Sequence, residues 1–113
     1  MDITTIAEGF SICEQLRADQ LEIVHAAGFR SIICNRPDGE ASDQPGFAEI
    51  DERARALGME TRYLPIKGLA CTGDDIASFE RALADLPGPT LGYCRTGARA
   101  KMLWSQLEDK RQS

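Results

Sequence analysis

The segment 90–100 combines a cysteine, two arginines and a glycine where a predicted strand passes into a predicted helix. Cys94 follows a short apolar run, a glycine then permits a tight turn, and a helical pattern begins directly afterwards. Backbone N–H groups of such a turn, with the positive end of the following helix, converge on an anion. Arg95 and Arg99 add positive charge, which favours a thiolate at Cys94. The segment therefore predicts a thiolate nucleophile at the mouth of an anion-binding loop, which is a catalytic arrangement.

The spacing of the two key residues distinguishes between two chemistries. Four residues separate Cys94 from Arg99, one fewer than in the signature of cysteine-dependent phosphatases, and Tyr93 stands where that signature usually has histidine. The resulting six-residue ring resembles the active loop of rhodanese-type sulfurtransferases, whose cysteine carries a terminal persulfide sulfur. A smaller ring leaves less room for a tetrahedral phosphate. The alternative is a structural cysteine at a strand end, followed by a helix with surface arginines.

The composition fits a single soluble domain spanning residues 1–113. The chain is 42% hydrophobic and 27% charged, and its length can bury one core without disulfides or metal. A net charge of -5 argues against nucleic acid or an anionic membrane as partner, because both select clustered basic surface. No apolar run is long enough to cross a bilayer, and the first residues lack the features of a signal peptide. We therefore expect a cytoplasmic protein with neither nucleic-acid nor membrane partners.

The remaining cysteines do not form a recognisable motif. Cys13, Cys34, Cys71 and Cys94 are too far apart for a redox CxxC pair or a zinc knuckle, and the chain has a single histidine, His25, on a predicted helix away from any strand end. We expect reduced thiols, no metal and no cofactor. All four cysteines fall at or just beyond predicted strand ends. Burial explains the other three as small hydrophobic residues, and a sulfur relay from Cys94 to Cys71 or Cys34 is the alternative.

Strand and helix patterns alternate along the chain. We predict strands at 9–14, 30–34, 60–66 and 90–93, and helices at 21–27, 47–57, 76–86 and 98–110. A polar stretch over 35–45 predicts a loop. The alternation indicates an α/β fold, a single small domain with a parallel sheet of about four to five strands flanked by helices. Ligands of such sheets bind at the carboxyl ends of the strands.

Two stretches together resemble a known family. The segments 32–40 and 93–99 resemble the phosphatase-like domain of beta-lactamase-hydrolase-like proteins, and the resemblance covers nearly the whole chain. It implies a fold of the cysteine-phosphatase and rhodanese kind, similar to dual-specificity phosphatases. Members of this family are often fused or linked to persulfide dioxygenases and have been assigned sulfurtransferase activity. The resemblance therefore also implies a persulfide dioxygenase as a possible partner.

The resemblance implies a role for each matching site residue. These are Cys94 as nucleophile, Arg99 as ligand of the oxyanion or sulfonate, Arg95 at the rim, Thr96, Gly97 and Ala98 along the ring, and Arg36 and Asp38 in a loop approaching the mouth. For Arg36 and Asp38 a plain turn, held by side-chain caps, is the alternative.

The acid that a phosphatase uses to protonate its leaving group is missing from the expected place. In dual-specificity phosphatases an Asp follows soon after the strand that corresponds to residues 63–66. In this chain the residues after that strand, 67–71, include no carboxylate. The next carboxylates, Asp74 and Asp75, fit a helix cap. Sulfite leaves without protonation. We therefore predict a sulfurtransferase that moves sulfane sulfur from a small anionic donor, thiosulfate or a persulfide such as glutathione persulfide, through a Cys94 persulfide.

Two other functions remain open. One is a cysteine-dependent phosphatase that acts on a phosphate ester through a phosphocysteine, with Asp38, Asp74 or Asp75 as acid. The other is a non-enzymatic module that carries persulfide or binds anions.

Overall fold

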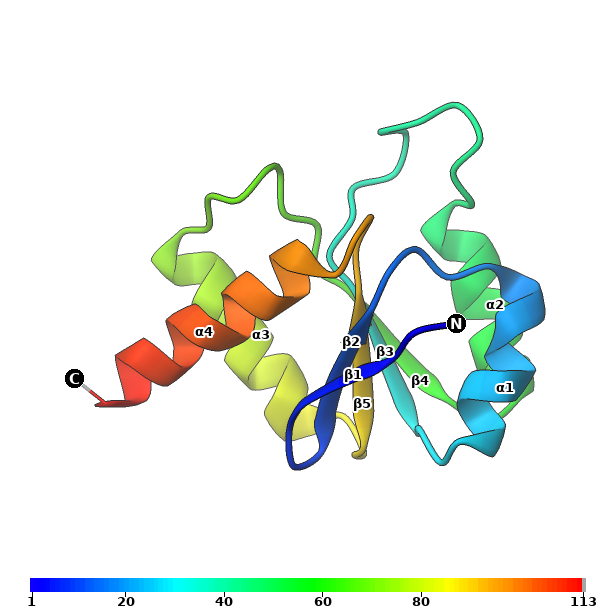
Figure 1. Cartoon of the computed structure of the whole chain (residues 1–113), viewed down its shortest axis with the longest axis horizontal. Helices are drawn as coiled ribbons and strands as arrows, with labels where there is room; N and C mark the ends of the chain where they lie inside the picture. The colour runs from blue at the N-terminus through cyan, green and yellow to red at the C-terminus, as the bar shows by residue number, and fades with distance from the viewer. Residues whose placement is uncertain (113) are drawn as a thin grey trace.

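The computed structural model describes residues 1–112 and builds them into a five-stranded sheet between two layers of helices (Figure 1). The elements in chain order are β1 (Thr4–Ala7), β2 (Phe10–Cys13), a 3-10 turn (Ala18–Gln20), α1 (Leu21–Ala26), β3 (Ser31–Cys34), α2 (Phe47–Ala56), β4 (Glu60–Tyr63), α3 (Gly73–Asp85), β5 (Thr90–Tyr93) and α4 (Ala98–Gln112). The strands lie in the order β1-β2-β5-β3-β4. The predicted α/β fold with flanking helices is confirmed.

The sheet is mixed rather than wholly parallel. β2, β5, β3 and β4 run parallel to one another, whereas β1 pairs antiparallel with β2. The sequence analysis missed β1, which is short, lies at the edge of the sheet and leaves its first two residues exposed, so it carries no apolar pattern. Gly9, with φ of +83°, closes the hairpin that joins it to β2.

The strand predicted over 60–66 ends early. β4 stops at Tyr63, because Pro65 has no N–H group for a continuous ladder. The chain nevertheless continues beside β3: the Leu64 N–H donates to the carbonyl of Cys34 at 2.8 Å, and the Ile66 N–H donates to that of Asn35 at 2.9 Å. This irregular edge brings the carbonyl of Ile66 toward the carboxyl end of the sheet.

Each face of the sheet carries its own core. Helices α1 and α2 cover one face and α3 and α4 cover the other (Figure 1). Successive residues of β3 point into opposite cores: Ile32 packs with α1 and α2, and Ile33 packs with α3 and α4. A strand buried on both faces reads as a continuous apolar run, as predicted for β3.

Gly92 in β5 sets how closely α4 packs on the sheet. A Cβ at this position would lie 3.1 Å from the ring of Phe10 and 3.4 Å from the Cβ of Ala100 on α4. Only glycine allows this approach without displacing its neighbours. The packing fixes the first turn of α4 beside the end of β5, where Cys94 lies.

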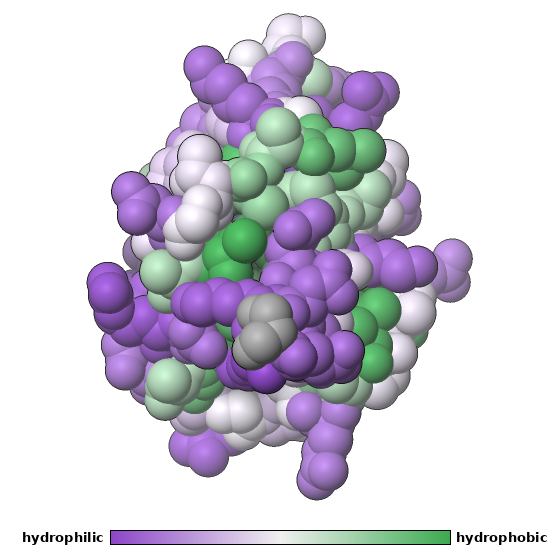
Figure 2. Space-filling model, turned by 90° about the vertical axis from the view of Figure 1, so that its left-hand side faces the viewer, coloured by the Kyte–Doolittle hydropathy of each residue, from purple (hydrophilic) through white to green (hydrophobic). Residues whose placement is uncertain are grey.

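The outer surface of the α3 and α4 layer is largely hydrophilic, with hydrophobic residues gathered mainly in its upper half (Figure 2). No helix within residues 1–112 has the length and apolar character that a membrane span requires.

Candidate active site

The carboxyl ends of three parallel strands meet below the Cys94 ring. Cys13 on β2 and Cys34 on β3 both lie in register with Tyr93, the last residue of β5. The Asn35 N–H donates to the carbonyl of Tyr93 at 2.8 Å, which extends the pairing by one residue. Cys94 is the next residue along the chain, so its position is fixed by strands on both sides.

The Cys94 sulfur lies at the base of the ring rather than at the mouth that the sequence analysis predicted. Its side chain is buried, with the residue 1% exposed. The backbone N–H groups of Gly97 and Arg99 donate to Sγ at 3.0 and 3.3 Å. Since α4 begins at Ala98, these donors belong to the positive end of a helix. The arrangement can stabilise a negative charge on sulfur.

Gly97 is required for this turn. Its φ of +96° is the left-handed conformation that other residues adopt at a cost, and a Cβ would lie 3.4 Å from the carbonyl of Cys13. The neighbouring N–H of Ala98 donates instead to the hydroxyl of Thr96 at 3.3 Å. Within residues 1–112, the backbone donors to the sulfur are therefore Gly97 and Arg99, not every amide of the ring.

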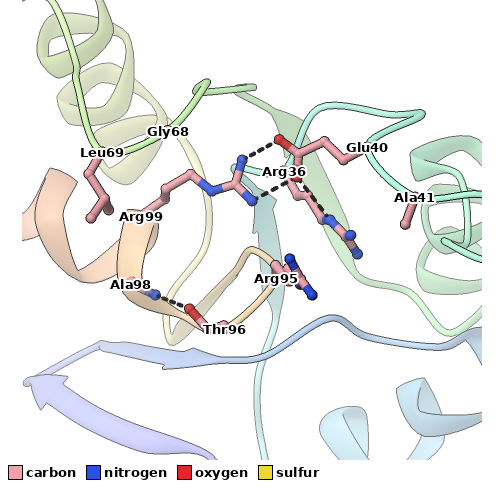
Figure 3. Close-up of a pocket in the computed structure, with 9 residues that line it drawn as sticks. All are labelled: Arg36, Glu40, Ala41, Gly68, Leu69, Arg95, Thr96, Ala98 and Arg99. Atoms are coloured by element: carbon pink, nitrogen blue, oxygen red, sulfur yellow. Dashed lines mark hydrogen bonds and ion pairs between the residues drawn. The ribbon is translucent and has the colours of Figure 1, made fainter.

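The Arg99 side chain is held by a bidentate ion pair. Its Nη1 and Nη2 donate to Oε2 and Oε1 of Glu40, each at 2.8 Å (Figure 3). Nη1 also donates to the carbonyl of Ile66 at 2.8 Å. Both partners come from distant parts of the chain. Hydrogen bonding to Glu40 raises the pKa of Arg99, and the neighbouring Cys94 sulfur contributes in the same direction.

These contacts leave one edge of the guanidinium available. An arginine carries two N–H groups on each terminal nitrogen and one on Nε. Glu40 and Ile66 take both donors of Nη1 and one donor of Nη2. The Nε donor and the second Nη2 donor lie parallel on the remaining edge, which matches the geometry of a bidentate contact with an oxyanion. Arg99 is thus oriented to offer two donors to a ligand.

Glu40 also binds a second arginine. Arg36 donates from Nε to Glu40 Oε1 at 3.1 Å and from Nη1 to Gln15 Oε1 at 3.0 Å. The Arg99 hydrogen bonds, followed by those of Arg36, lower the pKa of Glu40 to about 2. The carboxylate therefore remains ionised at any pH at which the protein is expected to work.

A cavity of about 720 Å³ opens above the ring. Its lining residues are Arg36, Glu40, Ala41, Gly68, Leu69, Arg95, Thr96, Ala98 and Arg99 (Figure 3). The structure thus brings five of the predicted site residues to one cavity, with Cys94 and Gly97 in the ring beneath it. Arg95 is exposed, and its side chain has no ion pair or hydrogen bond within residues 1–112.

Asp38 is the predicted site residue that belongs neither to the cavity lining nor to the ring. Its carboxylate accepts the N–H of Phe47 at 2.8 Å at the start of α2, and its own N–H donates to the Tyr63 hydroxyl at 2.9 Å. Asp75 is likewise committed, because it forms a capping box with Thr72 at the start of α3. The turn-and-cap alternative therefore describes Asp38, whereas Arg36 does reach the cavity.

The other cysteines divide into two groups. Cys13 and Cys34 are buried in the core, where desolvation raises the pKa of Cys13 to about 12 and also raises that of Cys34, so both remain neutral thiols. Cys71 does not lie at a strand end, since it falls in the loop between β4 and α3. None of these three lines the cavity. Within residues 1–112 no cluster of three or more His, Cys, Asp or Glu side chains could hold a metal ion.

Sequence reasoning assigned no role to Glu40. The residue lay within a segment used for the family resemblance, and a carboxylate four residues after Arg36 in a loop is unremarkable in sequence. Its importance comes from a contact with Arg99, 59 residues away. Leu69 and Ala41 were also missed, because only the fold brings them to the cavity.

Fold and site together define a cysteine-phosphatase-like α/β domain. The family model described as "Beta-lactamase hydrolase-like protein, phosphatase-like domain" matches residues 2–109. A beta-lactamase hydrolase-like protein of Xylella fastidiosa (strain Temecula1) is 38% identical over 108 residues, which is 96% of this chain. One of Agrobacterium fabrum is 36% identical over 104 residues, or 92% of the chain. The chain belongs to this family of phosphatase-like domains, and it spans about a quarter of the length of these curated relatives.

Solved structures agree on the fold. A Neisseria meningitidis protein named a "putative phosphatase" has a TM-score of 0.92 and 31% identity, and the match covers 100% of this chain and 80% of that one. The core catalytic domain of the PP-IP phosphatase Siw14 of S. cerevisiae has a TM-score of 0.75 at 12% identity, covering 98% and 67% of the two chains, and shows the fold alone. These comparisons support a phosphatase-like domain better than the sulfurtransferase that ring length predicted.

Proposed function

We propose that this domain is a cysteine-dependent phosphatase that removes a phosphoryl group from a small anionic substrate. The observation that carries the proposal is the position of the Cys94 sulfur at the N-terminus of α4, held by two backbone N–H groups and close to the side chain of Arg99. The same donors that stabilise a thiolate bind the oxygens of a phosphoryl group attacked by it. The family and the structural neighbours support this chemistry.

The reaction proceeds in two displacements. The Cys94 thiolate attacks phosphorus, an S–P bond forms, and the P–O bond to the leaving group breaks with its electron pair on the departing oxygen. Water then attacks the phosphocysteine, the S–P bond breaks, and its electrons return to sulfur as thiolate while inorganic phosphate leaves. The Nε and Nη2 donors of Arg99 bind two phosphoryl oxygens through both steps.

The state of the nearby carboxylates restricts the leaving group. Within residues 1–112, Glu40 is the only carboxylate that lines the cavity, and its low pKa leaves it no proton to donate. Asp38 and Asp75 are engaged in capping. The leaving oxygen must therefore depart as an anion, so we expect activity on aryl phosphates, acyl phosphates and phosphoanhydrides, and little on alkyl phosphates.

The test compares p-nitrophenyl phosphate with an alkyl phosphate of similar size. We expect hydrolysis of the aryl ester only, and its loss in Cys94→Ser. Equal rates on both esters would show that a general acid protonates the leaving oxygen. Hydrolysis that persists in Cys94→Ser would overturn the proposal.

A second candidate is the sulfur transfer predicted from the sequence. The observation in its favour is the six-residue ring from Cys94 to Arg99, which is one residue shorter than the phosphatase signature. Cys94 would attack the outer sulfur of thiosulfate, the S–S bond would break with its electrons on sulfite, and a thiol or cyanide would then take the sulfur from the Cys94 persulfide. Sulfite also leaves without an acid. Thiocyanate formed from thiosulfate and cyanide, with no release of phosphate from aryl phosphates, would establish this candidate. A stable persulfide on Cys94 without turnover would indicate a non-enzymatic persulfide carrier. A persulfide dioxygenase is a partner only if the domain is a sulfurtransferase or such a carrier.

A further inference from the structure

The cavity is larger than its reacting group requires. The ring and the Arg99 edge together bind one anionic group, yet the cavity measures about 720 Å³. Sites that enclose a whole small organic molecule measure about 300 to 1,000 Å³. The rest of the cavity therefore faces the part of the substrate that does not react.

This remaining wall is positively charged. Three arginines and one glutamate line the cavity, so Glu40 neutralises one charge and a formal charge of +2 remains, in a chain whose net charge is -5. Arg99 provides one of these two positive charges, and it binds the reacting group. The other has no partner among residues 1–112, and an uncompensated cation in a cavity selects for a second negative charge on the ligand.

Arg95 is the arginine that can provide it. Arg36 has a side chain only 6% exposed and is held on Nε and Nη1 by Glu40 and Gln15. Arg95 is exposed and has no partner within residues 1–112. Its backbone is nevertheless fixed, because its carbonyl accepts the N–H of Gln15 at 3.2 Å. The side chain therefore starts from a defined position and remains free to reach a ligand.

Leu69, the largest apolar residue that lines the cavity, lies away from Arg36 and Arg95. Leu69 is 67% exposed, and in Figure 3 it lies on the opposite side of Arg99 from the guanidinium groups of Arg36 and Arg95. A ligand with its reacting group on Arg99 can therefore place an acidic group on Arg95 without passing over Leu69.

We propose that the substrate carries a second anionic group, separate from the reacting one, and that Arg95, beside Arg36, is the specificity-determining residue that binds it. The substrate class is then an organic phosphate with an additional carboxylate or phosphate. This inference shares one assumption with the proposed function, namely that the reacting group of the substrate binds over the Cys94 ring.

Binding of non-hydrolysable ligands tests the inference without turnover. Calorimetry on the native chain would compare alkylphosphonates with ω-carboxyalkylphosphonates of matched chain length, over a short series of lengths. A charge-assisted hydrogen bond predicts that the best carboxylate ligand binds about tenfold more tightly than its neutral counterpart. In Arg95→Gln this ratio falls to near unity. In the matched control Arg30→Gln, an exposed arginine next to the first residue of β3 and hence at the opposite end of the sheet, the ratio is unchanged.

The outcomes separate this inference from the proposed function. Carboxylate and neutral ligands of equal affinity at every chain length, or a preference that survives in Arg95→Gln, would overturn the inference even if aryl phosphates are hydrolysed. A preference that depends on Arg95 supports the inference even if the covalent chemistry proves to be sulfur transfer. Added salt is expected to reduce the preference, because Arg95 is exposed and its charge is screened.

Discussion

The Cys94 ring and the long loop after β3 meet at one cavity but are held in place by different means. The ring is local: Gly97 turns the chain, and the two N–H groups that bind the sulfur lie within five residues of it. The loop over 35–46 depends on contacts with distant segments, such as the Asn35 side chain, which donates to the carbonyl of Leu64 at 2.9 Å. Its link to the ring is the pair between Glu40 and Arg99.

This difference separates the proposed nucleophile, Cys94, from the proposed anion ligand, Arg99. Changes in the long loop leave the backbone around Cys94 intact, because none of its hydrogen bonds to sulfur comes from that loop. The same changes release Arg99, whose orientation depends on Glu40 and Ile66. Substitutions in the two regions should therefore produce distinguishable defects.

Among substitutions that leave Cys94 in place, the largest effect is expected from Arg99→Lys, which keeps the charge and removes the paired donors. A lysine cannot bind Glu40 in bidentate fashion and still offer two donors to substrate. We expect kcat/KM for p-nitrophenyl phosphate to fall by about a hundredfold to a thousandfold, as when an oxyanion donor is removed elsewhere. Steady-state kinetics of the parent, Arg99→Lys and the control Arg30→Lys provide the measurement. A loss of kcat/KM smaller than tenfold in Arg99→Lys would show that positive charge alone is enough at this position.

Glu40→Gln tests the loop side of the comparison. The amide keeps the shape but loses the charge that orients both arginines, so we expect kcat to fall by about tenfold. Inhibition by inorganic phosphate should change much less. A less well oriented Arg99 weakens phosphate binding, whereas removal of the negative charge of Glu40 strengthens it, so the two effects oppose each other. Glu49→Gln, at an exposed position on α2, is the control. A kcat equal to that of the parent would mean that Arg99 is oriented without Glu40.

Gly97→Ala tests the ring side. A left-handed conformation at alanine is expected to lower the free energy of unfolding by about 1–2 kcal/mol. Gly28→Ala is a matched control, because Gly28 has φ of +100° and nothing within 4 Å of a new Cβ. Denaturant titration should show similar losses for both variants, whereas only Gly97→Ala should also lose turnover, through its displaced N–H. Full activity in Gly97→Ala would contradict the role given to that donor.

The smallest effect concerns pH. Because the folded protein lowers the pKa of Glu40 from 4.5 to about 2, the pair stabilises the fold fully above pH 4.5 and loses this contribution as pH falls toward 2. The difference in unfolding free energy between the parent and Glu40→Gln should therefore shrink over that range. A difference that stays constant down to pH 2 would show that the ionised pair does not contribute.

The parts of the molecule that follow from local pattern were predictable. The turn at Gly97, the start of α4 and the buried run of β3 depend on residues close in sequence, and the structure confirms these elements. β1 was missed because an exposed edge strand has no apolar alternation to detect. The burial of the Cys94 sulfur was missed for another reason, since the depth of a ring depends on the helix and strands that surround it.

The contacts that orient the site were not predictable. Nothing near Glu40 in the sequence distinguishes it from the other carboxylates of an acidic chain, and its partner lies 59 residues away. Asp38 illustrates the converse, because a carboxylate close to the site in sequence is engaged in capping α2. Residue types and spacing predicted Cys94 as the nucleophile, whereas the assignment of carboxylates required the fold.

The central claim is that the group being transferred passes through the Cys94 sulfur. Rapid acid quenching of a reaction with p-nitrophenyl phosphate, followed by peptide mass spectrometry, tests it most directly. We predict a phosphoryl group on Cys94 that appears before steady state and is absent from Cys94→Ser. Product formation with Cys94 unmodified at every quench time, and continued turnover in Cys94→Ser, would contradict the account.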